Sequence, residues 1–138
     1  MNRISFEVLG DPKAQKRHRS ARIGKGIRNY DPSAKEKQDF LLTVQQQAPK
    51  HPVSDPIKMT MCFYFGRAKS HFGTGANSGK LKKTASLIHK SKPDIDNLQK
   101  WVLDSLNGVF YTDDCLIYDI RATRYYSDKP RVFVRMEW

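Results

Sequence analysis

The sequence predicts a mixed α+β fold, a single compact domain in which helices pack on a mixed sheet. The length of 138 residues is that of one domain. Some segments alternate apolar and polar residues as strands do, and two others repeat apolar residues with the period of a helix. The expected order of elements over residues 1–138 is β-α-β-(loop)-α-β-β.

The strands are predicted by their two-residue alternation. The clearest one covers 57–65, where every second residue is apolar, and we expect it at the centre of the sheet. A first strand over 4–8 has the same alternation and ends at a Gly-Asp-Pro turn. Two further strands are expected over about 115–126 and over 131–137, joined by an Asp-Lys-Pro turn.

Two helices are expected between these strands. The first begins after Asp31 or Ser33, either of which can cap it, and runs to about Ala48. The second covers 96–106 and follows Pro93, which disfavours helix for the residue before it. Its apolar face consists of Leu98, Trp101, Val102, Ser105 and Leu106. An Asn-Gly pair after this face is a typical helix end.

The charge is strongly basic and unevenly distributed. The chain has 25 Lys and Arg against 14 Asp and Glu, a net charge of +11. Residues 1–91 hold 18 basic and 6 acidic residues, whereas residues 92–138 hold 7 and 8. A basic footprint of this size favours a nucleic-acid partner bound through its phosphates. The alternative is a charge that only keeps the protein soluble.

Two segments without any acidic residue, 13–28 and 66–92, are expected to be flexible basic loops. Because they contain no acid to pair with, we interpret them as phosphate-contacting loops rather than solvated charge runs. The candidate DNA-binding residues are Lys13, Lys16, Arg17, Arg19, Arg22, Lys25, Arg28, Lys80, Lys82, Lys83 and Lys92.

Composition argues against several other classes. Hydrophobic residues make up 38% of the chain, the mean hydropathy is −0.68, and no apolar run approaches the ~20 residues of a membrane span. The N-terminus has no signal-peptide pattern, and Cys62 and Cys115 form neither a disulfide framework nor a metal motif. We therefore expect a cytoplasmic protein with no membrane contact. The four histidines show no metal or triad spacing.

A glycine-rich stretch over 73–80 resembles a phosphate-binding loop but does not match one. From Gly73 the spacing to Gly79-Lys80 is one residue too long, and from Gly75 it is one too short. Leu81 stands where a Ser or Thr would coordinate magnesium. Nucleotide hydrolysis is therefore not the expected activity.

Carboxylates cluster at two places in this basic chain. Asp94 and Asp96 flank the start of the second helix, and Asp113-Asp114 follow its end. One Asp can cap a helix or shape a turn, but paired like charges are unfavourable unless a cation lies between them. Hard cations such as Mg²⁺ take carboxylate, phosphate and water oxygens. The acids therefore predict metal-assisted phosphodiester chemistry.

Two more charged residues lie on the second helix. Lys100 is four residues after Asp96, so it forms either an ordinary ion pair or a cation that stabilises charge at a scissile phosphate. Asp104 continues this face and is expected to be solvent-facing or paired with an arginine rather than a metal ligand.

Two other functions fit parts of the pattern. A non-enzymatic nucleic-acid-binding protein would explain the basic charge and leave the acids without a role. A metal-dependent sugar-nucleotide transferase would use Asp94 and Asp96 as a D-x-D motif, although the chain is short for its nucleotide-binding domain.

The acidic region resembles the RusA family of Holliday-junction resolvases. The similar segments are Lys92-Pro93-Asp94-Ile95-Asp96-Asn97-Leu98-x-Lys100, Leu103-Asp104-x-Leu106-Asn107-Gly108 and Asp113-Asp114, and more weakly Gly10-x-Pro12-x-x-x-Lys16-Arg17-x-Arg19. The resemblance implies a homodimeric, Mg²⁺-dependent endonuclease that cuts four-way DNA junctions in recombination and repair, with Mn²⁺ as a substitute ion. It also implies that Asp94, Asp96 and Asp114 bind the catalytic metal, with Asp113 as the alternative, and that Lys100 assists.

Overall fold

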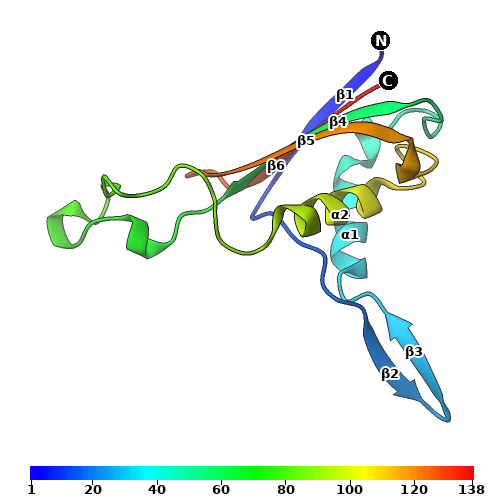
Figure 1. Ribbon diagram of the computed structural model, residues 1–138, viewed down its shortest axis with the longest axis horizontal. Helices are drawn as coiled ribbons and strands as arrows, with labels where there is room; N and C mark the ends of the chain where they lie inside the picture. The colour runs from blue at the N-terminus through cyan, green and yellow to red at the C-terminus, as the bar shows by residue number, and fades with distance from the viewer.

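A mixed four-stranded sheet lies at the centre of the computed structural model, which describes residues 1–138 (Figure 1). Its strands are β1 (Arg3–Leu9), β4 (Ile57–Phe65), β5 (Ile117–Tyr126) and β6 (Arg131–Glu137), in the order β1-β6-β4-β5. The mixed α+β class is confirmed, and β4 lies inside the sheet as expected, between β6 and β5.

Helix α2 (Ile95–Leu106) connects two parallel strands. β4 and β5 pair in parallel from Ile57↔Ile117 to Phe65↔Tyr126, and the chain returns between them through α2. The start of α2 therefore lies near the carboxyl ends of β4 and β5, and its end lies near their amino ends. Figure 1 shows α2 running alongside the sheet in this direction.

The core lies between the sheet and the two helices. Helix α1 (Ala34–Val44) and α2 pack aromatic side chains together, with the Phe40 and Trp101 ring centroids 5.0 Å apart. Phe6 of β1 lies 5.5 Å from Phe110, which follows α2. The predicted apolar face of α2 is buried at all five positions. Each fully buried large apolar side chain contributes about 1.5–3 kcal/mol, so this contact fixes α2 on the sheet.

Residues 13–28 differ from the loop expected from the sequence. Strands β2 (Arg19–Ile23) and β3 (Gly26–Tyr30) form an antiparallel hairpin paired from Arg19↔Tyr30 to Ile23↔Gly26. Gly24 takes the positive φ of +56° at the first position of the two-residue turn, where glycine is favoured. Nearly every hairpin residue is exposed. The sequence therefore shows no apolar alternation that would identify these strands.

Smaller differences concern where elements begin and end. Helix α1 stops at Val44 and a short 3₁₀ turn follows, because Ala48 precedes Pro49 and takes an extended conformation. β5 begins at Ile117 rather than 115, because a 3₁₀ turn occupies Asp114–Leu116. Segment 66–92 contains two 3₁₀ turns and no α-helix. None of the helices is long and apolar enough to cross a membrane.

The start of α1 is held by an ionic cluster around Lys37. Its Nζ lies 2.7 Å from Asp31 Oδ2 and 3.3 Å from Asp104 Oδ2, so it joins α1 to α2. The other Asp31 oxygen accepts the backbone N–H of Ser33 and the side-chain amide of Gln15. Burial would raise the pKa of Asp31, but these hydrogen bonds and Lys37 outweigh it and lower the pKa to about 2.

We predict that Asp31→Asn lowers the free energy of unfolding by about 2 kcal/mol at neutral pH, because the carboxylate has a lower pKa folded than unfolded. The unfolded chain binds the proton first as the pH falls, so this contribution is present above about pH 4 and disappears toward pH 2. Urea unfolding at several pH values measures it. Asp55→Asn, an exposed carboxylate without an ion pair, is the control. A constant difference between Asp31→Asn and wild type down to pH 2 would contradict the assignment.

Candidate functional site

Asp94 and Asp96 lie at the start of α2 with their carboxylates exposed. Asp94 is the N-cap residue by backbone geometry, with φ −72° and ψ 154°, yet its side chain makes no capping hydrogen bond. Neither carboxylate forms an ion pair with a basic residue of the chain. Capping therefore does not occupy these side chains, and both are available to an external cation.

Asp113 and Asp114 form a second acidic group after the end of α2. Asp113 Oδ1 accepts the Cys115 N–H at 3.0 Å, and this hydrogen bond lowers the pKa of Asp113. Burial raises the pKa of Asp114, and the negative charges of Asp113 and Asp104 raise it further. Asp104 itself is paired with Lys37, a lysine on α1 rather than an arginine. The negative charge of Asp114 is therefore not compensated by its surroundings, because the charged neighbours that shift its pKa are acidic.

The same neighbourhood includes a buried tyrosine. The Tyr111 hydroxyl donates to the Leu103 carbonyl at 2.6 Å, and burial together with Asp114 and Asp104 raises the pKa of Tyr111. This contact fixes the segment leading to Asp113-Asp114 beside the C-terminal half of α2. The second acidic group is therefore attached to the end of α2 opposite Asp94.

The three acids expected to bind metal are not brought together within one chain. Asp94 and Asp96 lie at the start of the 12-residue helix α2, whereas Asp114 is close enough to Asp104, two turns further on, for the charge of Asp104 to raise the pKa of Asp114. From Asp96 to Asp104 the helix rises about 12 Å, too far for side chains at both ends to share one ion. No group of three His, Cys, Asp or Glu side chains in this chain is placed to hold a metal.

The donor chemistry nevertheless fits a hard divalent cation. All candidate ligands are carboxylate oxygens, the ligands that Mg²⁺ prefers. The raised pKa of Asp114 indicates uncompensated negative charge, which a bound cation would relieve. What one chain lacks is a complete ligand set in one place.

A polar groove of about 420 Å³ brings basic residues together on the first two turns of α2. It is lined by Gln15, Lys16, Arg17, His18, Asn97 and Lys100. The Gln15 N–H donates to the Asn97 carbonyl at 3.1 Å, and the Lys16 N–H donates to the Ser33 hydroxyl at 3.2 Å. These bonds dock residues 15–18 on both helices. Lys100, one turn after Asp96, therefore shares a surface with Lys16 and Arg17.

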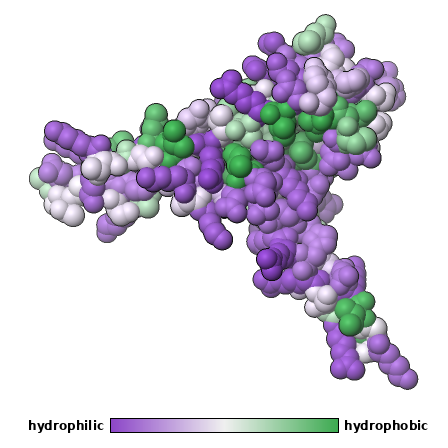
Figure 2. All heavy atoms as spheres, in the orientation of Figure 1, coloured by the Kyte–Doolittle hydropathy of each residue, from purple (hydrophilic) through white to green (hydrophobic).

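The remaining candidate DNA-binding residues lie on two projections. The hairpin β2–β3 carries Arg19, Arg22, Lys25 and Arg28, and the arm formed by residues 66–86 carries Lys80, Lys82 and Lys83. In Figure 1 the arm extends to the left of the sheet and the hairpin points down, with the start of α2 between them. Figure 2 shows hydrophilic atoms along both projections and a green apolar patch on each. The exposed apolar residues of the hairpin are Ile23 and Ile27, beside its turn. Lys92 is exposed just before the acidic pair.

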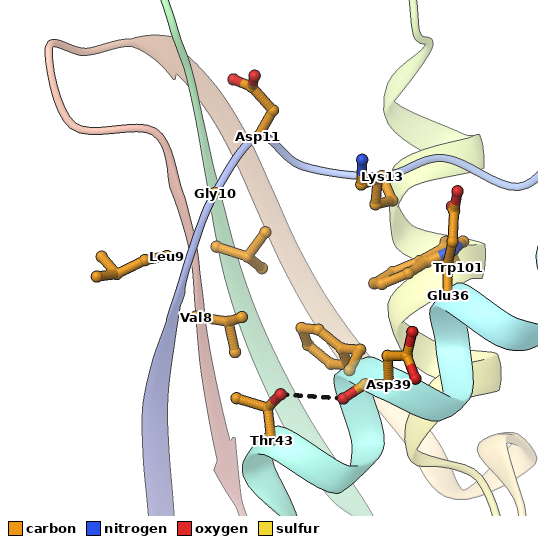
Figure 3. A pocket seen from close by; sticks show the side chains of 11 residues that line it. Val8, Leu9, Gly10, Asp11, Lys13, Glu36, Asp39, Thr43 and Trp101 are labelled. Atoms are coloured by element: carbon orange, nitrogen blue, oxygen red, sulfur yellow. Dashed lines mark hydrogen bonds between the residues drawn. The ribbon is translucent and has the colours of Figure 1, made fainter.

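Lys13 lies apart from this surface. It lines a cavity of about 310 Å³ between β1 and the two helices, together with Glu36, Asp39 and Trp101 (Figure 3). This cavity is mostly apolar with an acidic rim, and none of the expected metal ligands lines it. Its chemistry does not match phosphate, and Lys13 lies apart from the groove that contains Lys16, a candidate whose own ammonium lies 3.7 Å from Glu36.

Sequence reasoning missed the contacts that hold the acidic pair from behind. Arg124 on β5 donates to the carbonyls of Ser91 and Pro93, and His89 is buried against Phe65. The sequence gives only a weak indication of this role. Arg124 is paired with Phe63, on the face of β5 that the helices cover, where an apolar residue is usual. Nothing in the sequence indicates the partners of such a residue.

Comparison with known proteins agrees with this picture. The family model for endodeoxyribonuclease RusA matches residues 10–137, which include both acidic groups and the polar groove. A relative that matches along nearly its whole length is the uncharacterized protein YqaN of Bacillus subtilis (strain 168). It is 37% identical over 140 residues, covering 97% of this chain and 95% of that protein. The family match extends over three of the four strands of the sheet, both helices and both acidic groups, and the chain therefore belongs to the RusA family of endodeoxyribonucleases.

Proposed function

We propose that this protein is an Mg²⁺-dependent, structure-selective endodeoxyribonuclease that resolves four-way DNA junctions by paired phosphodiester hydrolysis. The observation that carries the proposal is a groove lined by Lys16, Arg17 and by Lys100 of helix α2, the helix whose start carries the exposed pair Asp94 and Asp96. Cations of this kind attract a DNA strand, and free carboxylates next to that strand repel it unless a metal intervenes. Membership of the RusA family supports a resolvase nuclease that acts in recombination.

The proposed metal ligands are Asp94 and Asp96 at one end of α2 and Asp114 at the other, with Asp113 as the alternative for Asp114. A divalent cation at such a site neutralises charge on the scissile phosphate and activates a water nucleophile. Mn²⁺, which also takes oxygen ligands, is expected to substitute for Mg²⁺. The cysteines and histidines are not needed for this chemistry.

A second copy of the chain is proposed to complete each ligand set. Because no group of three acids in one chain is placed to hold a metal, we infer that the Asp114 that joins Asp94 and Asp96 comes from a partner. A two-fold dimer, the commonest closed assembly, would form two such sites at once. Two sites match the approximate two-fold symmetry of a four-way junction, which must be cut on two strands.

The basic projections are proposed to hold the arms of the junction. The hairpin β2–β3 and the arm over 66–86 extend in different directions from the body that carries the acidic pair (Figure 1). Cationic extensions contact phosphates without reading sequence, which suits recognition of branched shape. A protein that acts on chromosomal DNA in this way works in the cytoplasm, at the nucleoid.

We predict that Asp94→Asn, Asp96→Asn and Asp114→Asn each slow junction cleavage by at least about 10²-fold while junction affinity stays close to that of wild type. A carboxamide cannot supply the charge that holds the cation, whereas the basic surfaces that bind DNA are unchanged. Cleavage and gel-shift assays with and without Mg²⁺ measure the two quantities. Asp119→Asn, an exposed acid on β5, is the matched control.

Asp113→Asn is expected to be milder than Asp114→Asn, and the reverse order would exchange their roles. Near-normal cleavage by any two of the three principal variants would contradict the metal assignment. If wild type binds junctions and never cuts them in any divalent ion, the protein is a binding module instead.

Lys100→Ala is expected to slow cleavage of bound junction by about 10²-fold and to weaken binding only slightly, because an interaction made chiefly in the transition state lowers turnover. Single-turnover cleavage at saturating protein separates the rate from the affinity. Lys50→Ala, which removes an exposed lysine far from the groove, is the control. A variant that binds weakly but cuts normally once bound would make Lys100 an ordinary phosphate contact.

A further inference from the structure

We propose that Arg124 is a positioning residue, which fixes the start of α2 and thereby places the carboxylates of Asp94 and Asp96. This inference rests on the proposed function and names the group that holds its acidic pair in place. Arg124 lies on β5 opposite Phe63, on the face of the sheet that the helices cover. It has no carboxylate partner in the chain, although its side chain is only partly exposed.

The guanidinium instead binds the backbone immediately before the acidic pair. Its NH1 group donates to the Ser91 carbonyl at 2.9 Å and to the Pro93 carbonyl at 2.5 Å. Pro93 is the residue before Asp94, whose own carbonyl accepts the first helical bond from Leu98 at 3.2 Å. One guanidinium group thus anchors two of the last three carbonyls ahead of the turn that carries both acids.

Backbone pairing attaches the same segment to the end of β5. The Tyr126 N–H donates to the Leu87 carbonyl at 2.9 Å, and the His89 N–H donates to the Arg124 carbonyl at 3.4 Å. Ile88 and Tyr125 form an antiparallel bridge. Residues 87–89 therefore pair with the end of β5, and Arg124 contacts residues 89–93 through both its main chain and its side chain.

His89 packs next to the guanidinium of Arg124 and stabilises the same attachment. Only 4% of His89 is exposed; its ring stacks on Phe65 at 3.8 Å and meets the edge of Tyr126 at 5.1 Å. Its Nδ1 lies 3.5 Å from NH1 of Arg124. The guanidinium is thus held in place by packing as well as by its hydrogen bonds.

This attachment matters because of what precedes it. The chain reaches α2 from the projecting arm over 66–86, which by itself does not fix where the helix begins (Figure 1). Metal ligands and reacting groups must be placed within a fraction of an ångström, and a misplacement of about 1 Å can cost about 10²-fold in rate. The anchor on Pro93 supplies that placement through the backbone carbonyl ahead of Asp94.

The test compares Arg124→Gln and Arg124→Lys with Arg121→Gln, which changes an exposed arginine on the opposite face of the same strand. Three quantities are measured: junction affinity, single-turnover cleavage in Mg²⁺, and hydrogen exchange of the metal-free protein without DNA. For Arg124→Gln we expect cleavage about 10²-fold slower, affinity within about twofold of wild type, and faster exchange confined to residues 87–98. A lysine ammonium can donate to a carbonyl but lacks the planar set of donors of a guanidinium group. We therefore expect Arg124→Lys to cleave about tenfold more slowly than wild type. Arg121→Gln should match wild type throughout.

Wild-type cleavage by Arg124→Gln would overturn the proposal. So would faster exchange spread over β4 and β6, because that result makes Arg124 a general support of the fold. If Arg124→Gln does not fold, a fully wild-type rate in Arg124→Lys refutes the proposal. If the wild-type protein cleaves no junction, the proposed function fails, and hydrogen exchange still decides whether Arg124 fixes residues 87–98.

Discussion

The parallel pairing of β4 with β5 is the constraint on which the rest of the molecule depends. Parallel neighbours cannot be joined by a tight turn, so the chain must cross over, and here it does so through the basic arm and α2. This crossover places Asp94 and Asp96 near the carboxyl ends of the two strands and Asp113-Asp114 at the opposite end of α2. The separation of the two acidic groups follows directly from the topology.

That separation gives the unpaired carboxylates an explanation. A protein with a net charge of +11 could neutralise its acids internally, and it does so for Asp31 and Asp104 through Lys37. It leaves Asp94 and Asp96 exposed and unpaired, and it leaves Asp114 with a raised pKa. In the proposed function, Asp94, Asp96 and Asp114 bind an external cation shared with a second copy, which would compensate their charge.

The sequence predicted the elements that bury a face and missed those that do not. The alternation in 57–65 and the helical periodicity around Trp101 exist because each segment buries one face in the core. The structure confirms the strand and the helix that they predicted. The hairpin β2–β3 buries almost nothing, so its strands are held by main-chain bonds that leave no apolar pattern. The motif over 92–100 identified the acids, but their distance from Asp114 and their anchor on Arg124 depend on how distant segments meet.

The measurement that tests the central claim most directly is complementation between two inactive variants, Asp96→Asn and Asp114→Asn. If each site combines Asp96 of one chain with Asp114 of its partner, a mixed dimer contains one site with both substitutions and one site with neither. The account therefore predicts that mixing the variants restores nicking of one junction strand without complete resolution. Mixed dimers that form, as mass measurement would verify, and still cut neither strand would contradict it.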